Sequence, residues 1–259
     1  VAHSFTKSNS PNALEVLRPT SIAIRKGELI SFIGPSGCGK STLLNVMGGL
    51  LQPKSGRVLL DQKEITSPNP SRVAYVFQEN ALFPWNTVLE NITIALTFQN
   101  IPKTEHLDRA KQALSDVGLL AFANHYPDEI SGGMKQRAAL ARALCLETDV
   151  ILMDEPFAAL DEQTRMVLGE DLSVLLSKTQ KTIVLVTHSL GEAVFLSDRV
   201  AVFSARPGTI KEVIDIEEAH PRKSEFVTSE KFNKFRNQLY SLLHEEVKKT
   251  ITSEVVLKS

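Results

Sequence analysis

The feature that most constrains this fold is a glycine-rich segment, residues 34–42, that directly follows an apolar run over residues 29–33. Its sequence, Gly-Pro-Ser-Gly-Cys-Gly-Lys-Ser-Thr, has the G-x-x-x-x-G-K-[ST] spacing of a phosphate-binding loop between a strand and a helix. In such a loop, successive backbone N–H groups surround a polyphosphate, and the following helix directs its positive N-terminus toward the same anion. The spacing therefore predicts a nucleoside triphosphate site in an α/β fold.

Two side chains of this loop have specific expected roles. The Lys40 ammonium can reach the β- and γ-phosphates, and the Ser41 hydroxyl can bind Mg²⁺. Two cysteines in the chain fit a reducing compartment. Cys38 lies inside the loop and is interpreted as a small filler there rather than a redox switch. The expected nucleotide-binding residues of the segment are Gly34, Pro35, Ser36, Gly37, Cys38, Gly39, Lys40, Ser41 and Thr42.

Two acidic residues, Asp154 and Glu155, follow the continuous apolar run of residues 150–153. Such a run suits a central strand of a parallel sheet, and ligands of open α/β sheets bind where those strands end. Asp154 is the natural partner of the Mg²⁺ held by Ser41. Glu155 is free to orient water against the γ-phosphate, because adjacent residues of an extended chain point in opposite directions. The alternative interpretation is a solvated pair of acids.

A histidine, His188, ends another apolar run, residues 183–187. A neutral imidazole can donate one hydrogen bond to a γ-phosphate oxygen while a neighbour holds its other nitrogen. A lone histidine is usually structural. Its expected place at the same sheet edge as the two carboxylates favours a functional role.

The length of the chain allows one large α/β domain or a core with a smaller lobe. The chain has 259 residues, 42% hydrophobic and 23% charged, with a formal net charge of −1. No basic field favours nucleic acid, and no stretch approaches the roughly 20 apolar residues that a membrane-spanning helix needs. Strands are expected at 21–24, 29–33, 58–60, 72–77, 150–153, 182–187, 200–204 and 209–214, and helices at 40–50, 87–98, 105–117, 132–146, 162–177 and 190–196.

Three features organise these elements. Gly27 and Glu28 separate two apolar runs, which predicts a hairpin and an antiparallel N-terminal β region. Residues 86–146 carry one helix after another, which predicts an α-helical lobe inserted into the α/β core. An amphipathic helix is expected over about 229–249, either docked on the core or serving as a partner-binding arm.

Residues 130–137, Ile-Ser-Gly-Gly-Met-Lys-Gln-Arg, resemble the signature peptide of ATP-binding-cassette (ABC) ATPases, L-S-G-G-x-x-x-R. Ser131 is expected to cap the helix that follows, and Gly132 and Gly133 to expose backbone N–H groups at its N-terminus. That arrangement would make a second anion site. A simple helix cap is the alternative for these residues alone.

The resemblance continues in family order along nearly the whole chain. It implies that Gln78 is the Q-loop glutamine, Asp161 belongs to the D-loop and His188 is the switch histidine. By the same resemblance, ATP and Mg²⁺ are the cofactors. The implied catalytic residues are Glu155, His188 and Gln78, and the implied metal ligands are Ser41, Gln78 and Asp154. Phe5 is a candidate for stacking on adenine, although an N-terminal phenylalanine is common enough to be incidental.

The departures from the family pattern are mild. Ile130 replaces the usual leucine, Ala158 stands where serine or glycine commonly begins the D-loop, and Ser189 stands where aspartate often follows the histidine. None of these changes removes a chemically necessary group. The resemblance implies a P-loop NTPase core with a mostly parallel sheet. It places an ABC ATPase domain over residues 1–220, with a RecA-like core and a helical lobe at about 86–146. Residues 221–259 would form a C-terminal helical extension.

In this family two cassettes stack head to tail, so that each ATP lies between the loop of one and the signature peptide of the other. This chain carries one set of these elements, so the resemblance implies a second ABC subunit, either an identical copy or a paralogue. The chain ends soon after one expected helix, so we expect neither an added regulatory β-barrel nor a fused anion-sensing domain.

Segments 81–92, 155–161, 192–199 and 204–208 resemble the nitrate/sulfonate/taurine importer branch. That likeness implies uptake of a small oxyanion such as nitrate, bicarbonate or an alkanesulfonate. It also implies contact with an integral membrane permease through the region from Gln78 to Trp85, and an indirect link to a substrate-binding protein. We expect no nucleic-acid partner. The chain is expected to lie peripherally on the cytoplasmic face of the inner (plasma) membrane. A core role for Trp85 is the alternative. Other functions that fit less well are a soluble ABC-type ATPase not tied to transport and a small-molecule phosphotransferase.

Overall fold

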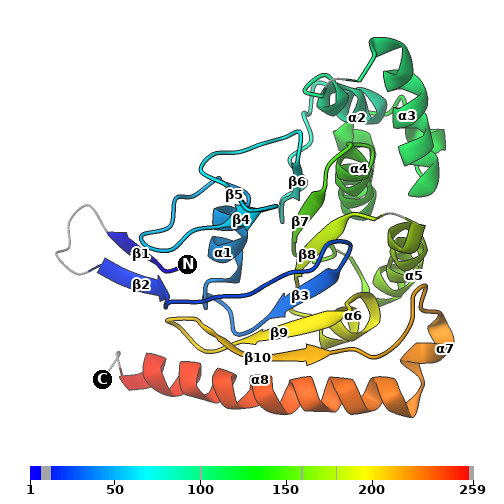
Figure 1. Ribbon diagram of the computed structural model, residues 1–259. Coiled ribbons are helices and arrows are strands. Elements are labelled where there is room, and N and C mark those ends of the chain that lie inside the picture. The colour runs from blue at the N-terminus through cyan, green and yellow to red at the C-terminus, as the bar shows by residue number, and fades with distance from the viewer. Residues whose placement is uncertain (7–12, 100, 159, 179, 257–259) are drawn as a thin grey trace.

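The computed structural model describes residues 1–6, 13–99, 101–158, 160–178 and 180–256 (Figure 1). In this part of the chain, six strands form a central sheet in the order β10-β9-β3-β8-β7-β6. Neighbouring strands from β9 to β6 run parallel, and β10 runs antiparallel to β9. The strands are β3 (Leu29–Ile33), β6 (Val73–Val76), β7 (Val150–Asp154), β8 (Thr182–Val186), β9 (Arg199–Phe203) and β10 (Ile210–Asp215). This mostly parallel α/β sheet is the predicted core.

The apolar runs explain why these segments lie inside the sheet. All five residues of β3 are buried, as are four of the five in each of β7, β8 and β9. A strand that is covered on both faces has no side chains facing solvent, so apolar and polar residues do not alternate along it and its sequence is continuously apolar. The parallel strands all end at one edge, and the loops that leave this edge carry the candidate site.

The antiparallel N-terminal region is present, but different strands form it. It consists of β1 (His3–Thr6) paired with β2 (Ala13–Leu17), and a second small pair joins β4 (Leu59–Leu60) to β5 (Lys63–Glu64). The expected hairpin through Gly27 is wrong. A turn does occur there, with Gly27 at φ +75°, but β3 pairs with β8 on one side and β9 on the other. No edge of β3 is left for residues 21–24, which form no strand.

Helices cover the sheet and build a separate lobe. Helices α2, α3 and α4 pack on one another around their own apolar cluster, which includes Val88, Ile92, Leu114 and Ala138. In Figure 1 this lobe stands above the sheet, with α4 reaching down beside β7. The helices are α1 (Lys40–Met47), α2 (Val88–Leu96), α3 (Lys103–Asp116), α4 (Gly132–Leu144), α5 (Glu162–Lys178), α6 (Leu190–Leu196), α7 (Ser224–Val227) and α8 (Glu230–Val256), with 3-10 turns at Leu120–Phe122 and Pro127–Glu129.

The C-terminal helix docks on the core. Phe232 and Leu239 of α8 are buried in the cluster that also contains α6 and β9 residues, and Phe235 and Leu242 pack against it. Figure 1 shows α8 running along the β9–β10 edge of the molecule. In the described residues, no helix is both long enough and apolar enough to span a bilayer.

Candidate active site

The phosphate-loop segment connects the end of β3 to the start of α1, and close packing explains its glycines. A Cβ on Gly34 would lie 2.8 Å from the Cβ of Phe203, and one on Gly39 would lie 2.7 Å from Cδ2 of Leu17. Gly37 and Gly39 also adopt φ values of +72° and +104°, which glycine tolerates and side chains resist. The loop therefore lies tightly against β2 and β9, as its backbone must if its N–H groups are to meet an anion.

The side chains of the loop divide into buried and exposed groups. Cys38 is fully buried in an apolar cluster, and burial raises the pKa of its thiol, as expected of a filler. Ser36 and Gly37 are exposed at the tip. Lys40 is only 5% exposed, and its Nζ donates to the carbonyl oxygens of Gly34 at 2.9 Å and Pro35 at 3.1 Å. The ammonium thus lies against the loop backbone.

A second pair of groups fits magnesium. The Ser41 hydroxyl donates to Oδ1 of Asp154 at 2.9 Å, which joins the start of α1 to the end of β7. Burial raises the pKa of Asp154 and the Glu155 charge adds to the rise, while the Ser41 hydrogen bond opposes it. No cluster of three or more metal-ligating His, Cys, Asp or Glu occurs among the residues described. One carboxylate beside a hydroxyl suits Mg²⁺, which is commonly held by one or two carboxylates, water and substrate phosphates.

Glu155 lies just beyond β7, where the backbone leaves the extended conformation. Its φ is +49°, a left-handed value that is uncommon outside glycine, while its N–H still donates to the carbonyl of Val186 at 2.9 Å. The backbone therefore turns at Glu155. The different places of the Asp154 and Glu155 side chains do not result from the simple alternation of an extended strand. Sequence reasoning missed this turn because no glycine or asparagine marks it.

Three candidate catalytic side chains meet at the sheet edge. Nε2 of His188 lies 2.6 Å from Oε1 of Glu155, and Nε2 of Gln78 donates to Oε2 of the same carboxylate at 3.5 Å. These residues follow β8, β7 and β6, which are consecutive in the sheet, and the glycine-rich loop follows the next strand, β3. The strand order thus brings together four segments that are far apart in sequence.

The segment around His188 is held by residues that sequence reasoning did not single out. Thr187 donates its hydroxyl to Glu192 at 2.5 Å and accepts the N–H of Ser189 at 3.0 Å. Glu192 also lies 3.2 Å from Nε of Arg165 on α5. Burial raises the pKa of Glu192, although the Thr187 and Arg165 contacts oppose the rise. These contacts orient the turn from β8 into α6, whose first residues follow His188.

The signature-like peptide starts α4. Ser131 is the N-cap residue, and its hydroxyl accepts the N–H of Met134 at 3.3 Å. A Cβ on Gly132 would meet nothing within 4 Å, whereas one on Gly133 would lie 2.7 Å from Cδ2 of Leu160. The expected helix cap is therefore present, and the peptide packs directly on the D-loop segment.

Asp161 has an evident local role. Its carboxylate accepts the backbone N–H of Thr164 at 2.9 Å and the Thr164 hydroxyl at 2.7 Å, and these hydrogen bonds lower its pKa. This is the pattern of a residue that caps the start of a helix, here α5. Ala159, in the same segment, lies outside the described residues.

Phe5 lies on β1 with 44% of its surface exposed, and its ring meets the ring of His3 edge to face at 4.7 Å. Its strand pairs with β2, whose Leu17 packs on Gly39 of the phosphate-loop segment. Phe5 therefore lies on the β1–β2 pair, which borders the phosphate-loop segment. Its contact with adenine stays a prediction.

The segment from Gln78 to Trp85 presents aromatic side chains to solvent. Trp85 is 71% exposed, so a core role is wrong, and its ring lies 5.4 Å from that of Phe83. Buried Asn91 holds this segment by accepting the N–H of Phe83 at 2.7 Å and donating to three backbone carbonyls, and Arg142 donates to Ala81 O at 2.8 Å. The exposed aromatic surface is therefore on a firmly held loop.

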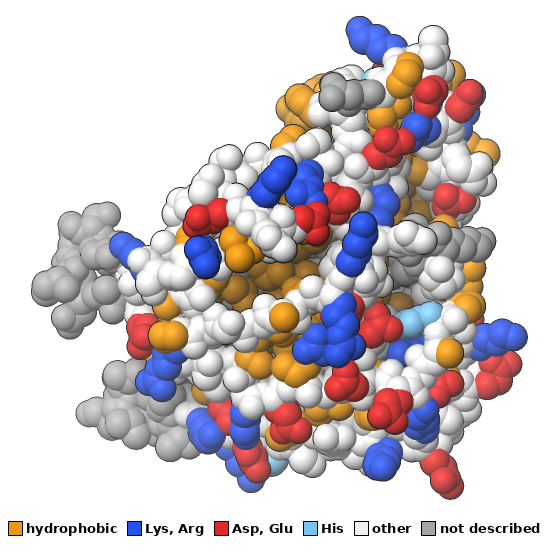
Figure 2. All heavy atoms as spheres, in the orientation of Figure 1, with side chains coloured by type: hydrophobic (Ala, Val, Ile, Leu, Met, Phe, Trp, Pro, Cys, Tyr) orange, Lys and Arg blue, Asp and Glu red, His pale blue; other side chains and the backbone are white. Residues whose placement is uncertain are grey.

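A large cavity lies away from these residues. It has a volume of about 910 Å³ and lies between α1, the segment 20–26 and the first residues of β6, β7 and β8. Figure 2 shows hydrophobic side chains on the floor of this hollow and Lys and Arg side chains near its rim. None of the candidate site residues lines it, because those residues follow the opposite ends of the strands.

Comparisons with known proteins agree with this geometry. Residues 17–158 match the ABC transporter family. The chain is 45% identical to an uncharacterized ABC transporter ATP-binding protein of Methanocaldococcus jannaschii, over 93% of this chain and 88% of the relative. It is 40% identical to the aliphatic sulfonates import ATP-binding protein SsuB of Bacillus thuringiensis, over 90% of each chain, and 42% identical to the nitrate import ATP-binding protein NrtC of Synechococcus elongatus, over 89% of this chain and 35% of the relative.

A solved structure is similar as well. It is the dimeric, post-hydrolysis state of an ATP-binding cassette bound to ADP and Pi, with a TM-score of 0.75 and 31% identity over 85% of this chain and 97% of that one. The chain therefore belongs to the ABC transporter family, as one of its ATP-binding ATPases. The predicted family, the α/β P-loop fold and the ATPase activity are confirmed.

Proposed function

We propose that this chain is the ATP-hydrolysing subunit of an importer that takes up a small oxyanion such as nitrate, bicarbonate or an alkanesulfonate. The convergence of Gln78, Glu155 and His188 beside the glycine-rich loop carries the enzymatic part of the proposal. The named nitrate and sulfonate importers among the relatives support the class of solute. Within the chain, residues 1–220 would form the ATPase domain and residues 221–259 the extension.

The proposed chemistry uses the groups at the sheet edge. The loop 34–42 binds the phosphates through its backbone N–H groups, and Lys40 leaves its carbonyl contacts to meet the β- and γ-phosphates. Glu155 orients the attacking water and accepts its proton. His188, whose Nε2 contacts the Glu155 carboxylate here, can donate its N–H to the γ-phosphate in place of that contact when nucleotide is bound. Ser41, Asp154 and Gln78 would hold Mg²⁺, which neutralises charge on the phosphates when bound.

The exposed groups of the chain suggest two protein partners. Ser131 and Gly132 are exposed at the N-terminus of α4, so they can approach an ATP on a second ABC subunit, and Asp161 and Phe5 would complete the composite site. The aromatic surface from Gln78 to Trp85 would contact an integral membrane permease, with a substrate-binding protein acting through it. The chain would then lie peripherally on the cytoplasmic face of the membrane.

The substitution Glu155→Gln tests the assignment of the water-orienting group. Because the amide keeps the size of the side chain but is not a base, ATP affinity should stay unchanged while turnover falls by about a thousandfold. Exposed Glu212 on β10 offers a matched control, and Glu212→Gln should leave turnover unchanged. Rapid hydrolysis by Glu155→Gln would remove this residue from its role.

The same pair tests the transport function. In vesicles that contain the permease and binding protein, the wild-type chain and Glu212→Gln should drive ATP-dependent accumulation of nitrate, bicarbonate or an alkanesulfonate, and Glu155→Gln should not. Accumulation of neutral sugars alone would contradict the proposed class of solute and leave the ATPase assignment intact.

A further inference from the structure

A buried carboxylate on the C-terminal helix reaches the sheet of the ATPase core. The side chain of Glu246 on α8 is 2% exposed. Its Oε2 accepts the backbone N–H of Ala205 at 3.0 Å, and its Oε1 accepts Nζ of Lys249 at 2.6 Å and Nζ of Lys211 at 3.2 Å. Burial by itself would raise the pKa of Glu246, but these three partners outweigh it and lower the pKa to about 2. The group is therefore a charged hydrogen-bond acceptor at neutral pH.

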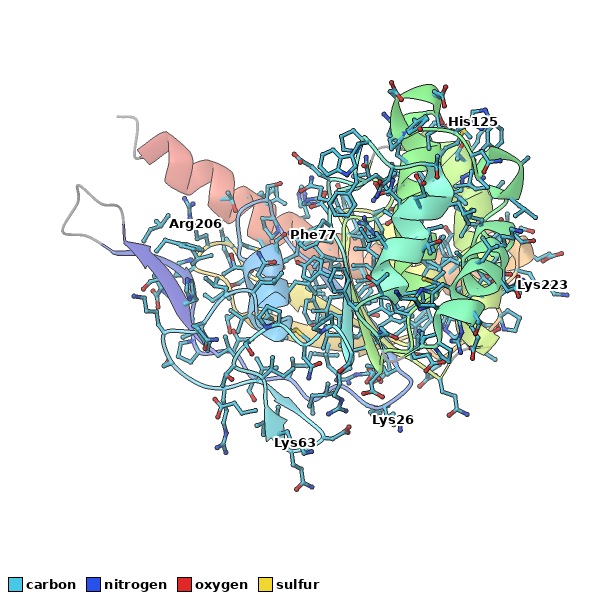
Figure 3. All side chains as sticks on the ribbon, turned by 90° about the horizontal axis from the view of Figure 1, so that it is seen from above. Lys26, Lys63, Phe77, His125, Arg206 and Lys223 are labelled. Atoms are coloured by element: carbon cyan, nitrogen blue, oxygen red, sulfur yellow. The ribbon has the colours of Figure 1, made fainter. Side chains whose placement is uncertain are left out.

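The N–H that Glu246 accepts belongs to a turn over residues 204–209, which connects β9 to β10. The turn is closed by hydrogen bonds from Ser204 N–H to Thr209 O at 2.9 Å and from Thr209 N–H to the Ser204 hydroxyl at 3.1 Å. Figure 1 shows this turn between α8 and the β1–β2 pair, and Figure 3, where Arg206 is labelled, agrees. Glu246 thus holds the turn from its outer side.

The inner side of the same turn contacts the phosphate-loop segment. A Cβ on Gly208 would lie 1.9 Å from the carbonyl oxygen of Cys38, so the two backbones are in direct contact. Gly208 is held there by hydrogen bonds to β2 and to the residue after it. Its N–H donates to Val16 O at 2.8 Å, and its carbonyl accepts the N–H of Arg18 at 3.0 Å. Only glycine leaves room for such an approach.

The contact extends along the loop. The end of β9 meets Gly34, where an added Cβ would lie 2.8 Å from the Cβ of Phe203 and 3.2 Å from its carbonyl oxygen. The chain from Phe203 to Gly208 therefore forms an outer wall of the loop from Gly34 to Cys38. A shift of this wall would shift the loop N–H groups, because close-packed backbones do not deform independently.

We propose that Glu246 is a positioning residue for nucleotide binding: by holding the N–H of Ala205, it keeps the 204–209 turn against the phosphate loop. The inference rests on the proposed role of residues 34–42. It gives the C-terminal helix a part in ATP affinity, although no residue of α8 would touch the nucleotide. A change in the position of α8 would then change the affinity for ATP.

The test compares neighbouring glutamates in the full-length chain. Glu246→Ala removes the acceptor for Ala205, whereas Glu245→Ala removes only an exposed partner of Lys211, which it meets at 2.8 Å with its own side chain 66% exposed. We expect Glu246→Ala to raise the Kd for Mg-ATP by about fivefold or more, as for a typical coupling between sites, and Glu245→Ala to leave it unchanged. Glu246→Gln keeps one oxygen that can accept the N–H, so its Kd should rise less.

Turnover measurements separate positioning from general damage to the fold. With positioning, KM for ATP rises in Glu246→Ala while kcat at saturating ATP stays within about twofold of the wild type, because the catalytic groups are intact. If Glu246→Ala does not fold by circular dichroism, Glu246→Leu decides, because it also removes the acceptor for the Ala205 N–H but keeps a bulkier side chain. A Kd equal to that of the wild type in the folded variant that lacks the acceptor would overturn the inference. A fall in kcat at constant KM would also overturn it.

Lys40→Ala distinguishes this inference from the proposed function. If Lys40→Ala loses ATP binding while the folded Glu246 variant that lacks the acceptor binds as the wild type does, the positioning role is wrong and the phosphate loop stands. If Lys40→Ala binds ATP normally, the assigned loop is wrong and the inference falls with it.

Discussion

At the scale of single residues, the room beside the backbone determines where the candidate site needs glycine. Gly132 and Gly133 are neighbours at the start of α4, yet a Cβ on Gly132 would meet no atom within 4 Å and one on Gly133 would lie 2.7 Å from Cδ2 of Leu160. Real Cβ atoms do not approach other atoms so closely, so Gly133 brings α4 against the D-loop segment. The signature-like peptide thus uses one glycine for packing and leaves the other open to solvent.

The two glycines therefore predict different effects of the same change. Gly133→Ala should lower the free energy of unfolding by about 1–2 kcal/mol, because Leu160 must move from a packed position. Gly132→Ala, at the first helical position with free space, should leave that free energy unchanged or raise it by a few tenths of a kcal/mol, about what alanine gains over glycine near a helix end. Urea denaturation of both variants checks this. Equal changes in the free energy of unfolding of the two variants would show that Leu160 moves aside without an energetic penalty.

At the scale of elements, the C-terminal segment supports the helix that follows His188. Arg222 is 2% exposed, and its guanidinium donates to the carbonyls of Val194 at 2.6 Å, Phe195 at 3.1 Å and Ser197 at 2.9 Å. These carbonyls belong to the last turn of α6 and the residue after it, where a helix leaves acceptors unsatisfied. Burial lowers the pKa of Arg222 to about 10, so the group stays charged at neutral pH.

This cap predicts a large cost for a conservative change. Arg222→Lys keeps the charge but lacks the planar fork, so several buried carbonyls lose their donors, and the free energy of unfolding should fall by about 3 kcal/mol. The neighbouring Lys223 is exposed, and Figure 3 shows it at the periphery, so Lys223→Ala should change that free energy by less than about 0.5 kcal/mol. Chemical denaturation measures both. Similar values for the two variants would contradict the capping role.

The elements also show how far the sequence predicts this fold and site. Long apolar runs predicted β7 and β8 well, because strands buried on both faces carry their own signal. The short ribbon of β1 and β2 and the left-handed Glu155 have no comparable local pattern. Contacts such as that of Arg142 with Ala81, 61 residues away, depend on tertiary packing that no local pattern encodes. The motifs therefore identified the candidate site, and the supporting contacts required the structure.

At the scale of the whole molecule, the proposed composite site would need two chains. The glycine-rich loop, Glu155 and His188 follow neighbouring strands, whereas Ser131 begins a helix of the α2–α4 lobe. A relative of this chain has been solved as a dimeric cassette bound to ADP and Pi. In a symmetric pair, each of two composite sites would take its loop from one subunit and its signature peptide from the other.

Mixing two inactive variants tests this composite site for a homodimer. Lys40→Ala removes the phosphate contact of the loop, and Ser131→Arg blocks the signature peptide with a large charged side chain. Each variant alone should therefore have turnover near zero. In a mixed dimer one site contains both defects and the other contains neither. Because random pairing makes half of the dimers mixed, equal amounts should restore about one quarter of wild-type turnover.

The control and the contrary outcome follow from the same geometry. A chain with both substitutions, mixed with either single variant, should restore nothing, because every pairing then leaves a defect in each site. If the two single variants form mixed dimers, detected by differently tagged copies, and turnover still does not return, loop and signature peptide do not act across subunits of a homodimer. Recovery well above one quarter would show that one intact site can work faster alone than each does in the wild-type pair.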